Sequence, residues 1–251
     1  GFNKVYELSK NFRNEGMDRN HNPEFTAVEF YQAYADVNDM MSITENLIKH
    51  ICGDLNIESI KYRGKEIEFM PKFKEEKFFD LISSKLSKDI SSMSLKNLII
   101  LANNKDIDIK KNSNYGQVLD KLFSELVEPD LINPTFVLDY PIEISPLAKK
   151  HRSNESLVER FELFIGGMEI ANSFSELNDP DEQVERFLEQ SKLKESGDEE
   201  AQMMDEEFIN ALQVGMPPTG GVGIGIDRLI MLLLGLSSIR DVIIFPAMRK
   251  H

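Results

Sequence analysis

The segment FRNEGMDRNHNPEFTAVEFY, residues 12–31, decides how we expect this chain to fold. In its second half Phe25, Ala27, Glu29 and Tyr31 recur at every second position. A period of two predicts a β-strand. Residues 5–15 alternate more weakly and predict a second strand, with a long polar loop between the two. We therefore expect two antiparallel strands within a mostly buried sheet.

Charged side chains on this hairpin indicate a ligand site. Glu29 interrupts an otherwise apolar strand, and a buried carboxylate is costly unless a cation meets it. Four other side chains gather at the mouth of the loop: Arg13, Glu15, His21 and Phe25. An arginine for phosphate and a phenylalanine for stacking on a base suit a nucleotide. The alternative is a surface ion pair, which is the commoner origin of an Arg-x-Glu pattern.

Composition restricts the class of protein. The 251 residues are 41% hydrophobic and 29% charged, as in ordinary globular proteins. We see no apolar run of membrane-spanning length and expect no membrane association. The net charge of −14 argues against nucleic-acid binding through bulk positive charge, although a local basic patch or separate basic domain stays open. The single cysteine, Cys52, excludes an internal disulfide framework and fits a reducing compartment, here the cytoplasm. Its place on an apolar helix predicts that it is buried.

The rest of the chain predicts an α+β fold, an antiparallel sheet flanked by helices. Helical spacing occurs at 38–55, where Asn38 or Asp39 would cap the helix, at 76–127, 179–196, 205–216 and 226–234. Extended segments are expected at 57–69 (a small hairpin), 132–151, 156–179 and 242–246 (a final buried strand). We interpret about 70–130 as a helical insert with a structural role.

A second group of candidate residues lies on the hairpin at 156–179. With a turn at Gly166-Gly167, Glu162 and Glu169 would project from one face as a diagonal pair. Two carboxylates at such a short distance need a cation between or beside them. Because the candidate ligands are all oxygen atoms, they favour Mg²⁺, which would bridge to phosphates.

Strict alternation would place Asn172, Phe174 and Glu176 on the face opposite Glu169. If these side chains all line one site, the strand must contain a β-bulge near Ala171. We predict that bulge.

The segment GIGIDR, residues 223–228, leads into an apolar helix and places Arg228 in its first turn. A cation there is unfavourable unless an anion binds, and helix N-termini are natural anion sites. Pairing of Arg228 with a nearby carboxylate is an equally good interpretation.

Together these segments resemble the class II aminoacyl-tRNA synthetases, and within them the bacterial-type lysyl-tRNA synthetases. FRNEG…HNPEFT-x-x-E-F-Y is similar to motif 2 of that family, and GIGIDR is similar to motif 3. ERFELFIGGMEIANSFSELND resembles the strand pair that the lysine enzymes carry between these motifs. The likeness covers nearly all of the sequence and is weakest over residues 57–127.

The resemblance implies a role for each candidate residue. Arg13, Glu15, His21, Phe25 and Arg228 would bind ATP, with Arg13 and Arg228 as the catalytic cations. Glu29, Tyr31, Asn172, Phe174 and Glu176 would bind lysine. Glu162 and Glu169 would carry Mg²⁺, in a number that the sequence does not define.

The implied activity is ATP-dependent formation of lysyl-adenylate and transfer of lysine to the 3′ end of its tRNA, by an enzyme that is a homodimer in the cytoplasm. The sequence shows neither motif 1 nor an N-terminal anticodon-binding domain, so we expect the C-terminal part of a catalytic domain, impaired alone. Three alternatives stay open: a lysine-type ligase that modifies elongation factor P, an aspartyl or asparaginyl enzyme, and a non-catalytic binding module.

Overall fold

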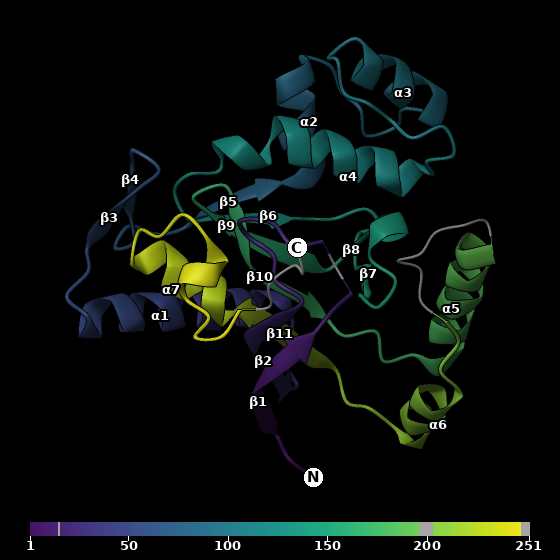
Figure 1. The fold of residues 1–251 in the computed structure, drawn as a ribbon. Helices are drawn as coiled ribbons and strands as arrows, with labels where there is room; N and C mark the ends of the chain where they lie inside the picture. Colours follow the sequence, from purple (N-terminus) through teal and green to yellow (C-terminus); the bar gives the residue numbers. More distant parts are fainter. Residues whose placement is uncertain (15, 196–202, 247–251) are drawn as a thin grey trace.

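A seven-stranded sheet forms the centre of the protein (Figure 1). The computed structural model describes residues 1–14, 16–195 and 203–246. In sheet order the strands are β1 (Lys4–Phe12), β2 (Glu24–Ala33), β11 (Thr219–Gly225), β10 (Met168–Ser175), β9 (Arg160–Ile165), β6 (Thr135–Leu138) and β5 (Lys74–Lys77). Neighbouring strands of this sheet run antiparallel, except that β5 and β6 are parallel. The α+β prediction is therefore confirmed.

The first two strands form the expected antiparallel hairpin, in which Val5 lies opposite Tyr31. The prediction that this hairpin lies in a mostly buried sheet is wrong for β1. This strand is at the edge of the sheet, and Tyr6 is 79% exposed. Alternation reports only that a chain is extended. It does not report what covers its two faces.

Helices α1 (Val37–Asp54) and α7 (Ile226–Leu233) pack against the sheet and form the larger hydrophobic core with it. The side chain of Asp36 caps α1, and Asp39 completes a capping box with it. The helix therefore begins one to two residues before the expected caps, because an aspartate in extended conformation was available upstream. Cys52 is buried in this core, as predicted.

The helices predicted within residues 76–127 are α2 (Phe78–Leu86), α3 (Leu95–Asn103) and α4 (Tyr115–Leu126), which lie together at the top of Figure 1. They enclose a second hydrophobic core, which they share with Val137 and Phe164 of the sheet. Strand β5, directly before α2, was not predicted. Its sequence KEEK has no apolar alternation to reveal a strand.

Smaller elements surround this framework. They are the hairpins β3 (Ser59–Tyr62) with β4 (Lys65–Glu68) and β7 (Lys150–His151) with β8 (Asn154–Val158), and the helices α5 (Pro180–Glu195) and α6 (Glu206–Val214). Short 3-10 turns occupy Glu128–Asp130, Ile142–Ile144 and Ile239–Asp241. Within the described ranges, no helix combines the length and the apolar character needed to cross a membrane.

The final buried strand predicted at 242–246 is wrong. These residues form turns and bends, and Ile244 and Phe245 are 85% and 88% exposed. The backbone N–H of Ile239 instead donates to the carbonyl of Arg19, which attaches this segment to the loop between β1 and β2. An apolar run becomes a strand only where a sheet edge is available to pair with it.

Candidate active site

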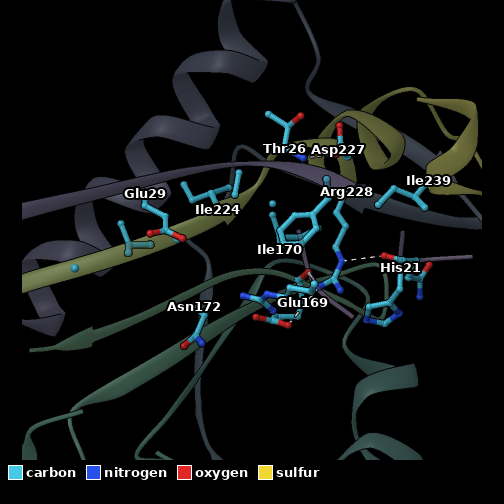
Figure 2. Close-up of a pocket in the computed structure, with 18 of the residues that line it drawn as sticks. His21, Thr26, Glu29, Glu169, Ile170, Asn172, Ile224, Asp227, Arg228 and Ile239 are labelled. Carbon is cyan, nitrogen blue, oxygen red and sulfur yellow. Dashed lines mark hydrogen bonds and ion pairs between the residues drawn. The ribbon is translucent and has the colours of Figure 1, made fainter. Parts of the chain in front are cut away.

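A cavity of about 380 Å³ lies over one face of β2, β11 and β10 (Figure 2). It brings together ten of the twelve side chains singled out in the sequence, although these come from three separate stretches of the chain. They are Arg13, His21, Phe25, Glu29, Tyr31, Glu169, Asn172, Phe174, Glu176 and Arg228. Of the remaining two, Glu162 does not line the cavity, and Glu15 lies outside the described residues.

The β-bulge predicted near Ala171 is present. The register between β10 and β9 shifts between Glu169 and Ala171, so that Glu169 lies opposite Phe164 and Asn172 lies opposite Glu162. Ile170 and Ala171 both belong to the hydrophobic core. The bulge thus restores one face for the residues before and after it, as the cavity requires.

The floor of the cavity is β11, which carries glycines opposite the functional side chains. Gly221 lies opposite Tyr31 on β2, and Gly223 lies opposite Glu29. A Cβ atom on Gly221 would lie 2.0 Å from Glu176 Oε1 and 2.7 Å from the ring of Tyr31. A residue with a side chain would therefore displace the groups that meet above this strand.

One end of the cavity is acidic. Burial, followed by the charge of Glu29, raises the pKa of Glu176 to about 8. Burial and both glutamates raise the pKa of Tyr31 to about 12, and its hydroxyl lies 3.5 Å from Glu29 Oε2. Within the described residues no lysine, arginine or histidine forms an ion pair with either carboxylate.

The expectation that Glu29 is buried is wrong. It is solvent-exposed, because the face of β2 that carries it borders the open cavity instead of a packed layer. Glu29 therefore interrupts an apolar strand at a place where that strand has no core to cover.

The opposite end of the cavity is cationic and aromatic. The guanidinium carbon of Arg13 lies 5.3 Å from the centre of the Phe25 ring. His21 Nδ1 lies 2.9 Å from a carboxylate oxygen of Asp18. Figure 2 shows His21 and Arg228 on one side of the cavity and Glu29 on the other. The cavity is thus polarised along its length.

Arg228 is placed by the first turn of α7, as predicted. Its Nη1 donates to the carbonyl of Glu169 at 2.8 Å and lies 3.3 Å from Glu169 Oε2, and its Nε donates to the carbonyl of Asn20. The carboxylate pairing that the sequence left open is therefore present. The preceding Asp227 accepts the backbone N–H of Thr26 at 2.6 Å and ties the helix to β2.

Glu162 lies beside the cavity, opposite Asn172 on the neighbouring strand, and is contacted by other side chains. Its Oε2 accepts the hydroxyl of Tyr140 at 2.7 Å, and its Oε1 pairs with Arg160. Burial raises the pKa of Glu162 to about 7, and the charge of Arg160 and the Tyr140 hydrogen bond act against that shift. The sequence argument missed both partners.

The chemistry of Glu162 and Glu169 fits a hard divalent cation, since Mg²⁺ takes one or two carboxylates together with phosphate oxygens and water. The charge of Glu169 contributes to the raised pKa of Glu162. In the described part of the chain, no group of three or more His, Cys, Asp or Glu side chains is arranged to hold a metal alone. A metal here would need ligands from a bound substrate.

Sequence reasoning overlooked several residues that shape the site. Asn22 lines the cavity and is almost fully buried, and its Oδ1 has no hydrogen-bond partner among the residues that the structure describes. Asp227 precedes the predicted cation, and its position in the first turn of a helix was a usable signal. Tyr140 gave no signal, because nothing in the spacing indicates its contact with Glu162. Arg160 was a usable signal, because it lies two residues before Glu162 on the same strand and alternation places both on one face.

The profile of the family "tRNA synthetases class II (D, K and N)" matches residues 1–249. The chain belongs to this family, as the resemblance of its motifs implied.

Among curated proteins, the chain is similar to enzymes named lysine–tRNA ligase. It is 52% identical to the one from Clostridium novyi over 254 residues, which are 99% of this chain and 50% of that protein. It is 53% identical to that from Thermotoga maritima over 257 residues, 99% of this chain and 49% of the relative. For the Clostridium botulinum strain Langeland protein the identity is 53% over 258 residues, with 100% and 51% covered. The chain spans about half the length of the curated relatives it matches.

Proposed function

We propose that this chain carries the site at which a lysine–tRNA ligase activates lysine with ATP. The observation that supports this most is the polarity of the cavity. Two carboxylates lie at one end with no cation from the described part of the protein, and arginines with an aromatic ring lie at the other end. An ammonium group suits the first end, and a purine nucleotide suits the second. The names of the similar curated proteins include lysine, whose side chain carries such an ammonium group.

In this proposal Glu29, Tyr31 and Glu176 bind the lysine side chain, with Phe174 as a wall and Asn172 near the substrate carboxylate. Arg13 contacts the α-phosphate of ATP and the carboxylate of lysine, and His21 lies toward the pyrophosphate. Phe25 and Arg228 enclose the adenine ring, and Glu15 contacts its amino group. Glu162 and Glu169 hold Mg²⁺, which would neutralise phosphate charge when bound.

The chemical step joins a carboxylate oxygen of lysine to the α-phosphorus of ATP. The bond from that phosphorus to the bridging oxygen breaks, and pyrophosphate leaves with the electron pair. No general base is required, because the nucleophile is already ionised. The protein's part is to hold the two substrates in line and to neutralise developing charge with Arg13 and Arg228.

A second step would pass the lysyl group to the 3′-terminal ribose of the matching tRNA. The finer proposals are that the parent enzyme works in the cytoplasm as a homodimer, and that this chain is part of its catalytic domain, with the helices near 70–130 as an insert. An aspartyl or asparaginyl substrate is disfavoured, because Glu29 and Glu176 would repel an anionic side chain and offer a neutral amide no matching charge.

The test is calorimetric titration of the 251-residue chain with a stable lysyl-adenylate analogue in the presence of Mg²⁺. The matched control is the aspartyl analogue, which differs only at the side chain. We expect the lysyl form to bind and the aspartyl form not to bind. Binding of both with equal affinity would contradict the assignment of the acidic end to the lysine side chain.

Transfer assays separate this proposal from a ligase that modifies elongation factor P. Radiolabelled lysine should appear on tRNA and not on that protein. Failure of the chain to bind ATP with Mg²⁺ would instead support a non-catalytic binding module.

A further inference from the structure

Arg160 is the first residue of β9 and is not among the residues that line the cavity. Its side chain is only 13% exposed. Every polar edge of its guanidinium has a partner within the protein. Nη1 donates to Ile144 O at 2.7 Å and to Ser145 Oγ at 2.9 Å, and Nη2 pairs with Glu162. The ring centre of Tyr140 lies 4.6 Å from the guanidinium carbon.

The remaining donor of Arg160 contacts a residue that does line the cavity. Its Nε donates to Asn172 Oδ1 at 3.1 Å. A guanidinium has donors only, so the carboxamide atom facing it must be the oxygen. The orientation of the Asn172 amide is therefore set by chemistry and not by an arbitrary choice between oxygen and nitrogen.

The consequence appears on the cavity side of Asn172. With Oδ1 occupied by Arg160, the Nδ2 amino group is the part of the carboxamide left for a ligand, and it has no partner in the described part of the chain. Figure 2 shows Asn172 on the sheet beside the cavity, between its acidic end and Glu169. An N–H donor at this place suits an oxygen of a substrate and cannot accept a proton from one.

We propose that Arg160 is a positioning residue, which locks the Asn172 carboxamide so that its N–H groups face the cavity and bind an oxygen of the amino-acid substrate. The same guanidinium holds Glu162, so one rigid fork orients a residue on the amino-acid side of the cavity and a carboxylate on the phosphate side. This inference rests on the proposed function, because it assigns the donors of Asn172 to the amino acid.

Arg160→Lys is the informative variant, because it keeps a positive charge beside Glu162 but loses the planar fork that reaches Asn172 at the same time. Asn172→Asp is its matched partner. An aspartate still accepts from Arg160 but has no N–H to offer the cavity. We expect each variant to weaken lysine binding about tenfold, the scale for a hydrogen bond to a charged group. Affinity for ATP, measured without Mg²⁺ so that Glu162 has no metal to bind, is the control for folding and should not change.

A double-mutant cycle with Arg160→Lys and Asn172→Ala separates positioning from a general structural effect. Lysine binding is measured by calorimetry without ATP or Mg²⁺, so that Glu162 has no ligand to influence. If Arg160 acts through Asn172, the double variant binds lysine no more weakly than Asn172→Ala alone. Losses that multiply in the double variant would overturn the proposal.

A measurement without ligand keeps this inference distinct from the proposed function. The side-chain amide signals of Asn172 are assigned by NMR from their loss in Asn172→Asp. We expect them to shift in Arg160→Lys and further in Arg160→Met. Unchanged signals would overturn the positioning role even if lysine binds. If the wild-type chain binds no lysine, the proposed function fails for this chain, while the amide signals still decide the role of Arg160.

Discussion

Two pairs of glutamates lie at or near the cavity, and they differ in whether a cation of the protein contacts them. Glu162 and Glu169 are each met by an arginine, the first by Arg160 and the second by Arg228. Glu29 and Glu176 have no cation among the described residues, and burial raises the pKa of Glu176 to about 8. The comparison teaches that a site can be recognised by the charge it leaves unmet. The first pair is neutralised by arginines of the protein itself, whereas a cation for the second pair has to come from a ligand.

The largest effect should follow from breaking the ion pair between Glu162 and Arg160. Glu162→Gln leaves Arg160 buried without its carboxylate, and removing one partner of a buried ion pair costs about 3–5 kcal/mol. For a chain of this size the melting temperature should fall by about 10 °C at pH 8, where the wild-type pair is ionised. Thermal unfolding followed by circular dichroism provides the measurement. A melting temperature within about 2 °C of wild type would contradict the conclusion that Glu162 stabilises the fold through its ion pair with Arg160.

Glu176→Gln should have the opposite signature. It removes a carboxylate that has no protein cation, so stability should stay the same or rise, because burial disfavours the charge. Lysine binding should weaken by about 2–3 kcal/mol, the scale for losing a buried charge partner. The affinities for lysine and for ATP are measured in separate calorimetric titrations. Equal losses for the two ligands would contradict the assignment of Glu176 to the acidic end.

Gly221→Ala tests whether the acidic pair depends on an absent side chain. The added Cβ would overlap Glu176 Oε1, so we expect lysine affinity to fall by about 1–2 kcal/mol while ATP affinity is kept. Gly223→Ala is the matched control, because its Cβ would lie 3.7 Å from Glu29 Cγ, an ordinary contact. The binding constants of both variants are compared by calorimetry. A larger loss at Gly223 than at Gly221 would show that the overlap above the floor is not what matters.

Lysine binding should also depend on pH, a graded effect within the unsubstituted protein. Below about pH 8 the acidic pair retains a proton on Glu176, which a bound ammonium group must displace. Lysine affinity should therefore rise with pH between 6 and 8, by at most about tenfold per unit, and should do so less in Glu176→Gln. Proton release on binding is measured by calorimetry in buffers of different ionisation enthalpy.

The same titration has a defined sign for folding. A carboxyl with a raised pKa binds more protons in the folded state than in the unfolded state. Its contribution to stability therefore declines as pH rises from the usual carboxyl range to about 8. An affinity for lysine that does not change with pH would indicate that Glu176 is ionised before the ligand arrives.

Much of the framework was predictable because its signals are local. Alternation identified the β1–β2 hairpin, helical spacing identified α1 and α2 to α7, and the glycines at 166 and 167 identified the turn, where both adopt positive φ. The bulge was predicted from a conflict between parity and shared function. The edge position of β1, strand β5 and the fate of residues 242–246 were not, because each depends on which strand lies beside it.

The site divides in the same way. Residue type and motif resemblance named the ten side chains that the structure gathers around one cavity. They did not reveal that Glu29 is exposed, or that Glu162 lies outside the cavity lining and contacts Arg160 and Tyr140. Except for the contact with Arg160, those facts depend on packing between distant strands, for which a single sequence carries no local signal.

The bulge between Glu169 and Ala171 has a consequence for how this strand can change length during evolution. Losing one residue there would turn the side chains that follow toward the hydrophobic core and bring core residues to the substrate, without altering a single amino acid among them. Insertions and deletions in this stretch are therefore tolerable only in pairs. The number of residues between Glu169 and Glu176 is as firmly constrained as the identity of either residue. A substrate site of this kind can therefore be lost through a change in that number alone.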